Sequence, residues 1–182
     1  MKKAHVLWLT GLSGAGKSTI ARELEILLEE KGKRVFVLDG DKVRDRLKKS
    51  LGFSREHILL NNAGVADLCL ENISDYDYIL VSVISPFYEA RENNRRKLDG
   101  SYHEVYVKAS LDEVIKRDTK GLYKKALKGE IKNFIGIHEN VPYEAPKNCE
   151  LVIDTENTAI VDSVRKLVLY IEQIEQEDKA IL

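Results

Sequence analysis

The run Gly11-Leu-Ser-Gly-Ala-Gly-Lys-Ser-Thr19 constrains the fold more than any other part of this chain, because it fits the pattern G-x-x-x-x-G-K-[S/T] in full. Just before it, residues 5–10 form a nearly continuous apolar run that predicts a buried strand. Just after it, apolar residues recur at helical spacing at Ile20, Leu24, Leu27 and Leu28. The alternative is a chance glycine-rich turn. A strand, a glycine-rich loop and a helix in succession favour a phosphate-binding loop.

The residue types of this loop explain how it would bind phosphate. Glycines allow backbone conformations and close approaches that a Cβ would forbid, so consecutive N–H groups can surround an anion. Lys17 adds a positive charge within reach of the β- and γ-phosphates, and Ser18 offers a hydroxyl to Mg²⁺. We therefore expect a nucleotide to be bound, with its phosphates held by Gly11, Ser13, Gly14, Ala15, Gly16, Lys17, Ser18 and Thr19.

Strand and helix patterns alternate along the rest of the chain. Further strands are predicted over 34–38, 77–84, 102–107 and 150–154, and helices over 42–50, 56–72, 88–98, 111–117 and 158–177. This alternation predicts an α/β fold, a parallel sheet of about five strands with helices on both faces. At 182 residues and 43% hydrophobic content, we expect a single domain over residues 1–182.

Composition limits the partners and the location. The net charge is −1, which argues against a protein that coats nucleic acid or binds a membrane surface. The longest apolar run, over 79–84, is too short to span a bilayer. The two cysteines, Cys69 and Cys149, lie far apart without a C-x-x-C spacing. We expect no nucleic acid, no membrane and a cytoplasmic location.

Residues at the carboxyl ends of the predicted strands are the candidates for chemistry, because ligands bind at that edge of a parallel sheet. Asp39 and Asp41 follow the strand over 34–38, and one could hold Mg²⁺ while the other accepts a proton from an attacking hydroxyl. The alternative is a polar Asp-Gly-Asp turn. Ser85 follows the next strand, as a phosphate contact or a nucleophile; no histidine or lysine is next to it in sequence, which favours a contact.

A basic segment follows the helix predicted over 111–117. Residues 116–132 contain seven basic residues and two acidic ones, Asp118 and Glu130. The segment over about 117–146 could be a mobile lid that closes over phosphates and excludes water. The alternative is a solvated helix face. The guanine-specific motif N-K-x-D is absent, which favours an adenine nucleotide such as ATP. The seven basic residues are Lys116, Arg117, Lys120, Lys124, Lys125, Lys128 and Lys132.

Several runs together resemble the adenylylsulfate kinase family over most of the chain. The resemblance lies in residues 11–19, 38–41, 43–44, 51–54, 84–86, 117–124, 129–134 and 142–146. It implies a P-loop NTPase fold of the nucleotide-kinase type, often as a homodimer. It also implies transfer of phosphate from ATP, with Mg²⁺, to the 3′-hydroxyl of adenosine 5′-phosphosulfate (APS) in sulfate activation.

The resemblance also implies roles for individual residues. Asp41 resembles the catalytic base, Asp39 the residue that supports Mg²⁺ with Ser18, and Ser85 the serine that is phosphorylated in some members. Phe53 and Phe134 look like the pair that encloses the adenine of the acceptor. The remaining implied contacts are Arg44, Asn61 and Lys120 to the acceptor and Arg117 to the adenine of ATP.

One segment departs from the family pattern. After Leu51–Ser54 the family usually carries Asp-Arg and then Asn-x-Arg-Arg, but those arginines are missing from residues 55–64. Their absence removes charge that would hold a phosphosulfate. Compensation could come from Arg55, Arg91, Arg95 or Arg96. Two alternatives therefore stay open: a kinase for another nucleotide, for example cytidine diphosphoramidate, and a nucleotide-binding module without catalysis.

Overall fold

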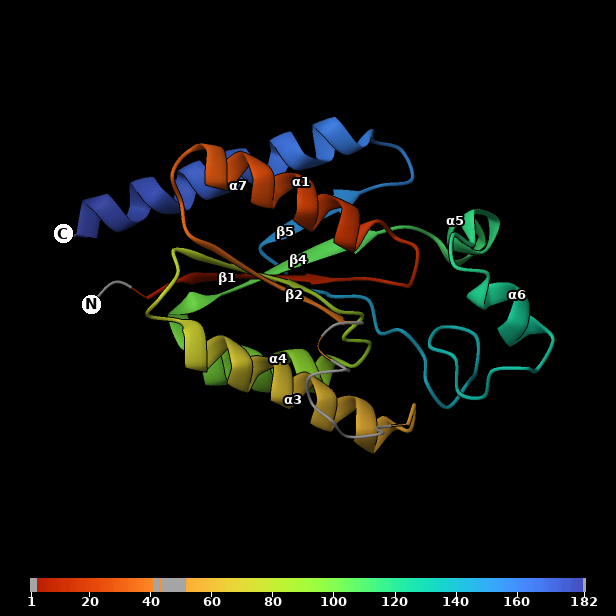
Figure 1. Ribbon diagram of the computed structural model, residues 1–182. Helices are drawn as coiled ribbons and strands as arrows, with labels where there is room; N and C mark the ends of the chain where they lie inside the picture. Colours follow the sequence, from red (N-terminus) through yellow and green to blue (C-terminus); the bar gives the residue numbers. More distant parts are fainter. Residues whose placement is uncertain (1–2, 41–42, 44–51, 182) are drawn as a thin grey trace.

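The computed structural model describes residues 3–40, 43 and 52–181 (Figure 1). The predicted base Asp41, the predicted acceptor contact Arg44 and almost all of the helix predicted over 42–50 lie outside these residues.

The centre of the molecule is one parallel sheet of five strands in the order β2-β3-β1-β4-β5. The strands are β1 His5–Thr10, β2 Val35–Asp39, β3 Tyr78–Ser82, β4 Tyr102–Lys108 and β5 Leu151–Asp154. The predicted parallel sheet is confirmed. Because β1 lies between β3 and β4, the loop that follows it opens at the middle of the carboxyl edge.

Helices cover both faces of this sheet, as predicted (Figure 1). Helices α1 Lys17–Glu30 and α7 Ile160–Ile181 lie on one face. Helices α3 Arg55–Asn72 and α4 Tyr88–Leu98 lie on the other. Helices α5 Leu111–Arg117 and α6 Leu122–Leu127 extend beyond the carboxyl edge, and a short 3₁₀ turn, Asp99–Ser101, precedes β4.

Alternate side chains of β1 pack into two separate apolar layers. Leu7 and Leu9 belong to the layer that includes residues of α1 and α7. Val6 and Trp8 belong to the layer that includes residues of α3. A strand buried on both faces has no polar side, which explains why residues 5–10 read as a continuous apolar run.

The segment over 117–146 is anchored to the body of the protein at several points. Asp118 accepts the backbone N–H groups of Tyr123 and Lys124 at the start of α6. The bond from Lys124 is the largest cause that lowers the pKa of Asp118, so the carboxylate remains charged as a cap. Tyr123, Phe134 and Val141 are buried. The segment predicted from its basic residues therefore also contributes apolar residues to the core.

Two apolar residues, one of α1 and one of α7, lie at the surface. Leu27 is 39% exposed and Ile160 is 37% exposed. They lie with Ile26 and Val161 along an open apolar groove between α1 and α7. Within the described residues, no helix is long and apolar enough to cross a membrane.

Candidate active site

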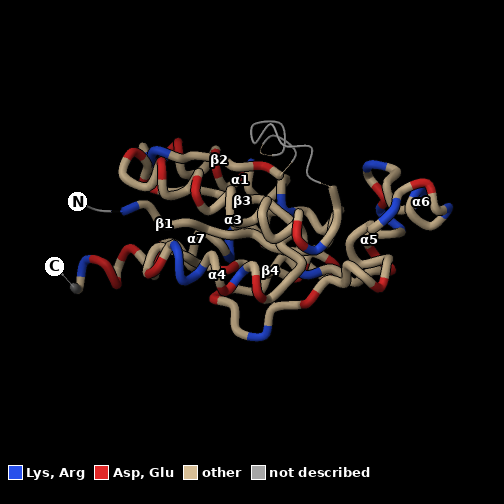
Figure 2. Tube along the Cα trace, turned by 90° about the horizontal axis from the view of Figure 1, so that it is seen from below, with Lys and Arg blue, Asp and Glu red and all other residues tan. Residues whose placement is uncertain are grey.

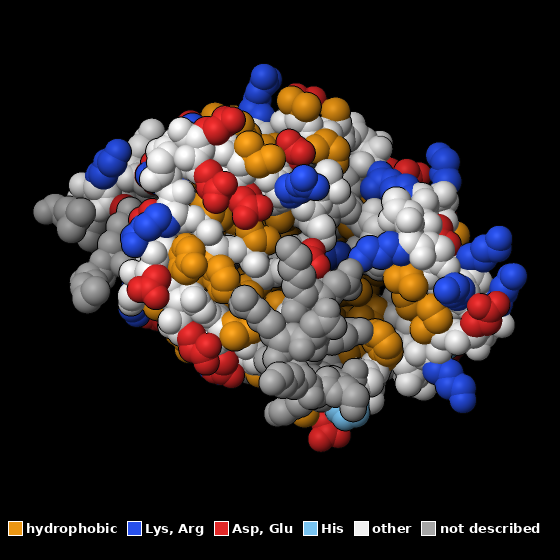
Figure 3. Space-filling model, in the orientation of Figure 1, with side chains coloured by type: hydrophobic (Ala, Val, Ile, Leu, Met, Phe, Trp, Pro, Cys, Tyr) orange, Lys and Arg blue, Asp and Glu red, His pale blue; other side chains and the backbone are white. Residues whose placement is uncertain are grey.

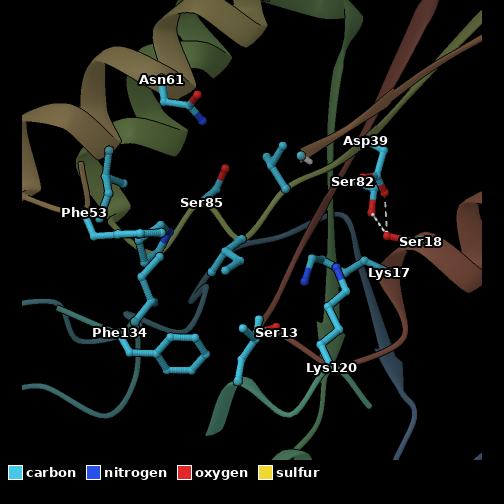
Figure 4. Close-up of a pocket in the computed structure, with 18 of the residues that line it drawn as sticks. Ser13, Lys17, Ser18, Asp39, Phe53, Asn61, Ser82, Ser85, Lys120 and Phe134 are labelled. Carbon is cyan, nitrogen blue, oxygen red and sulfur yellow. Dashed lines mark hydrogen bonds between the residues drawn. The ribbon is translucent and has the colours of Figure 1, made fainter. Parts of the chain in front are cut away.

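A cavity of about 520 Å³ opens at the carboxyl edge of the sheet, between the glycine-rich loop and α3 (Figure 4). One wall comes from the loop and the start of α1, and the facing wall comes from α3 and the segment after α6. Predicted residues that line it are Ser13, Gly14, Gly16, Lys17, Ser18, Thr19, Asp39, Phe53, Asn61, Ser85, Lys120 and Phe134.

The geometry of the loop depends on its first glycine and on Lys17. A Cβ at Gly11 would lie 2.3 Å from the carbonyl oxygen of Val107, so only glycine fits there. The Nζ of Lys17 donates to the carbonyls of Gly11 at 2.9 Å and Leu12 at 2.8 Å. Its charge is therefore held over the loop, on the wall of the cavity.

Two side chains bind backbone carbonyls of the loop, and Arg117 contacts one of them. The hydroxyl of Tyr123 donates to the carbonyl of Ser13 at 2.9 Å, and that of Thr155 donates to the carbonyl of Ala15 at 2.8 Å. Burial raises the pKa of Tyr123, so this hydroxyl keeps its proton. Arg117 donates to the carbonyl of Thr155 at 2.7 Å and lies beside the cavity rather than on its wall.

Oxygen donors from three elements meet at the start of α1 (Figure 4). The hydroxyl of Ser18 donates to Asp39 Oδ2 at 2.6 Å and lies 3.2 Å from the hydroxyl of Ser82. Residues Asp39 and Ser82 are paired in the register of β2 and β3, which explains the proximity. Hydroxyl and carboxylate oxygens are the donors that suit Mg²⁺.

The facing wall presents aromatic and amide side chains. Phe134 is buried and stands edge-on to Tyr123, with ring centroids 5.0 Å apart. Phe53 lies on the same side of the cavity as Phe134 (Figure 4). Within the described residues, the Oδ1 atom of Asn61 is buried without a hydrogen-bond partner. A buried acceptor of this kind indicates a place for a donor group of a ligand.

Ser85 lies on the cavity wall, but its hydroxyl is already engaged. The side chain of Trp8 donates to Ser85 Oγ at 2.8 Å, and Ser85 donates in turn to Asn62 Oδ1. Ser85 is 1% exposed and has a φ of 46°, which is unusual for a residue with a Cβ. These contacts hold it in a fixed orientation.

The arginines suggested as compensation are committed to other contacts. Arg55 pairs with Glu89 at 2.8 Å and lies over the ring of Phe87 at 4.3 Å. Arg91 is buried and its Nε lies 2.9 Å from Glu104, as an ion pair without the geometry of a hydrogen bond. Neither arginine is on the cavity wall.

The two other candidate arginines on α4 also lie away from the cavity. Arg95 binds Glu150 at 2.5 Å and Glu104 at 3.4 Å, and Arg96 is exposed. Neither lines the cavity. None of the four arginines lines the described cavity, so the suggested compensation stays a prediction.

The basic segment contributes one of its seven cations to the cavity wall, Lys120. Lysines of this segment lie on the outer surface around α5 and α6, where blue groups gather (Figures 2 and 3). For most of them the solvated-face alternative is the better description.

Residues 3–154 match a family model described as adenylylsulphate kinase. The chain belongs to this family. The probable adenylyl-sulfate kinase of Aeropyrum pernix is 44% identical over 177 residues, 96% of each chain. The adenylyl-sulfate kinase of Staphylococcus epidermidis is 44% identical over 174 residues, 95% of this chain and 86% of that protein.

Solved structures place this member of the adenylylsulfate kinase family in the same fold. The Mycobacterium tuberculosis APS kinase in complex with AMPPNP and APS is 34% identical, with a TM-score of 0.88 over 94% of this chain and 99% of that chain. A shikimate kinase from Acinetobacter baumannii shares the fold at 18% identity, with a TM-score of 0.60.

Several cavity residues of this kinase were not singled out from the sequence. Ser82, His57 and Ile58 all line the cavity. Ser82 had a partial signal, since it lies near the end of the strand predicted over 77–84; the observed β3 ends at Ser82, beside Asp39 of β2. His57 and Ile58 had no such signal in the sequence, because the direction of their side chains depends on how α3 packs against the sheet.

Proposed function

We propose that this protein is an ATP- and Mg²⁺-dependent kinase that phosphorylates the 3′-hydroxyl of APS. The observation that carries the proposal is a single cavity with two chemically different walls. A phosphate loop with Lys17 forms one wall, and Phe53 and Phe134 lie on the other. A polyphosphate donor and an aromatic acceptor base would thus be held in one enclosed space.

The loop supplies the donor side of the reaction. Its backbone N–H groups and the N-terminus of α1 favour the phosphates of ATP. Lys17 neutralises charge that develops on the transferred phosphate. Arg117, which donates to the carbonyl of Thr155, would contact the adenine of ATP.

Ser18 and Asp39 would hold Mg²⁺, directly or through water. The ion, when bound, neutralises phosphate charge and orients the transferred group. Because Mg²⁺ usually keeps several waters and phosphate oxygens as ligands, one hydroxyl and one carboxylate are a sufficient protein contribution.

The acceptor side orients the hydroxyl that is attacked. Phe53 and Phe134 would enclose the acceptor base, while Arg44, Asn61 and Lys120 contact the rest of the nucleotide. Asp41, two residues after Asp39 in the chain, would accept the proton of the 3′-hydroxyl. A carboxylate in this role acts chiefly in the transition state.

The test compares kcat/KM for APS with that for a panel of other nucleotides at fixed ATP and Mg²⁺. We expect APS to be phosphorylated with a raised KM, because the described cavity wall includes Lys120 but no arginine. A cytidine nucleotide preferred by more than about a hundredfold, roughly 2.7 kcal/mol, would replace APS as the acceptor. ATP binding without transfer to any nucleotide would support a non-catalytic module instead.

We further propose that residues 1–182 act as one kinase domain, with 117–146 as its cover, and that two copies form a homodimer. The apolar groove between α1 and α7 supports self-association, because Glu23 and Arg165 border it and could pair across a two-fold axis. Assembly occurs in a relative: a solved Thiobacillus denitrificans APS kinase is hexameric and 28% identical, with a TM-score of 0.68 over 94% of this chain and 29% of that chain.

A further inference from the structure

A chain of buried polar side chains connects β1 to α3 on the acceptor side of the cavity. The indole N–H of Trp8 donates to Ser85 Oγ at 2.8 Å, and Ser85 donates to Asn62 Oδ1. The amide of Asn62 then donates to the carbonyl of Ile58 at 2.9 Å. Trp8 is fully buried, and Ser85 and Asn62 are 1% and 3% exposed. Each donor in this series of hydrogen bonds has one acceptor, so the direction of the series is fixed.

The centre of this chain is also fixed through its backbone. Arg91 donates to the carbonyl of Ser85 at 2.7 Å, and the hydroxyl of Thr10 lies 3.3 Å from the same oxygen. Thr10 ends β1, directly before the phosphate loop. Ser85 is therefore a fixed point relative to that loop, and Asn62 is the residue through which α3 is attached to it.

The first two turns of α3 carry side chains of the acceptor wall. His57, Ile58 and Asn61 all line the cavity. Asn62 also lines the cavity, but it is only 3% exposed and its side chain is already bonded to Ser85 and to the carbonyl of Ile58. A change at Asn62 would therefore move the acceptor wall while leaving the phosphate loop in place.

We propose that Asn62 is a positioning residue for the acceptor: through Ser85 and Trp8 it sets the distance between α3 and the phosphate loop. The proposal rests on the proposed kinase function for its kinetic consequence. The positioning of α3 by Asn62 does not depend on which nucleotide is the acceptor. The positioning role and the proposed kinase function can therefore fail separately.

The variant Asn62→Asp separates positioning from simple burial. When its carboxyl is protonated, the new residue can accept from Ser85 and donate to Ile58, as the amide does. When it is ionised, it has no proton for the carbonyl of Ile58, and two acceptors face each other. The acceptor KM of this variant should therefore rise with pH, by roughly tenfold across about pH 5 to 8.

Other ionisable groups lie near these hydrogen-bonded side chains and also contribute to the pH dependence of the acceptor KM. Arg91, from α4, is paired with Glu104 of β4, and His57 lies five residues before Asn62 on α3. Tyr143 lies 3.0 Å from the hydroxyl of Thr10. The wild type carries all four groups, so its own pH profile is subtracted from that of the variant.

A matched control is available on the same helix. The amide of Asn72 donates to the carbonyl of Leu68 at 2.8 Å, the same spacing as Asn62 and Ile58. Asn72 ends α3 and does not line the cavity. Asn72→Asp should leave the KM of both substrates and their pH dependence as in the wild type.

The decisive measurement combines kinetics with the signal of the single tryptophan. In Asn62→Asp we expect a pH-dependent acceptor KM, an unchanged ATP KM, and an indole N–H resonance of Trp8 that shifts with pH; none of these changes occurs in Asn72→Asp. An indole resonance unaffected by pH, or an equal rise in both KM values, would overturn the proposal. If Asn62→Asp does not fold, Trp8→Phe removes the first donor together with part of a buried ring, and should raise the acceptor KM about threefold with the ATP KM unchanged.

Discussion

Lys17 has two tasks in this site, since its ammonium group closes the loop through two carbonyls and faces the cavity. We predict that Lys17→Ala lowers kcat/KM for ATP by at least about a hundredfold, because hydrogen bonds to a charged group contribute about 1.5–3 kcal/mol each. Steady-state kinetics and calorimetric titration with ATP measure this loss. Lys125→Ala removes an exposed charge outside the cavity and is the control, with normal kinetics expected.

Ser85 can be tested as a nucleophile against its role as a buried link. Ser85→Ala leaves the indole N–H of Trp8 and the side-chain oxygen Oδ1 of Asn62 without these partners, so we expect a loss of about 1–3 kcal/mol in the free energy of unfolding. Phosphoryl transfer at saturating acceptor should persist. Urea unfolding measures the loss of stability, and kcat measures phosphoryl transfer. A loss of turnover as deep as that of Asp41→Ala would instead identify Ser85 as a nucleophile.

Much of the site could be predicted at the residue scale because it follows a continuous motif. Residues 11–19 carry their own geometry, and Asp39 was found from its place at the end of a strand. Trp8 and Asn62 could not be found, because their link depends on the register of β1 and β3 and on the docking of α3. The ion pairs of the suggested arginines could not be found for a related reason: sequence shows a charge but not the carboxylate that pairs with it.

Among the elements, the strands were predictable and the segment after α5 was not. Strands buried on both faces produce continuous apolar runs, which single-sequence patterns detect well. Helix α6 has only six residues and lies between Gly121 and Gly129, so it presents no helical period long enough to recognise. Its stability comes from the cap at Asp118 and from buried Tyr123 rather than from its own pattern.

The contact between this segment and the phosphate loop gives a prediction at the element scale. Gly136 has a φ of 85°, and a Cβ there would lie 2.7 Å from Leu12 Cδ2. Gly136→Ala should therefore raise the KM for ATP and destabilise the protein by about 1–3 kcal/mol. Thermal unfolding with and without ATP measures both effects.

Gly129→Ala is the matched control for this prediction. Gly129 has a φ of 75°, but a Cβ there would meet no atom within 4 Å. Gly129→Ala therefore introduces the same kind of backbone strain as Gly136→Ala, but without the contact to the phosphate loop. Equal KM values for ATP in the two variants would show that the contact with Leu12 has no functional role.

At the scale of the whole molecule, the amino edge of the sheet predicts sensitivity to acid. His103 lies 3.1 Å from His5 and 2.9 Å from the hydroxyl of Tyr170, and burial lowers the pKa of His103 to about 4. The folded protein thus favours the neutral ring, whereas the unfolded chain takes up a proton near pH 6.5. Stability should fall as pH drops from about 6.5 to about 4, by no more than about 3 kcal/mol.

Urea unfolding across this pH range measures the effect, with His103→Gln as the comparison. The variant should lose less stability between the two pH values than the wild type does, because glutamine does not titrate. If the free energy of unfolding falls equally with pH in the two proteins, the acid sensitivity comes from other groups.

The apolar groove between α1 and α7 predicts how two copies would associate. Val161 is 72% exposed at this groove, so Val161→Glu should convert a dimer to a monomer in light scattering coupled to size exclusion. Leu169→Glu changes a residue of α7 that is 60% exposed but outside the groove, and should leave the dimer intact. A wild type that is monomeric at all concentrations would contradict the homodimer.

The position of β1 in the middle of the sheet also matters for how the protein is made. This strand is synthesised before both of its neighbours, β3 and β4. A largely apolar strand is without its partners during that interval, which favours slow folding and exposes the strand to aggregation. The segment that carries the phosphate loop is therefore the part of the nascent chain most in need of protection by chaperones.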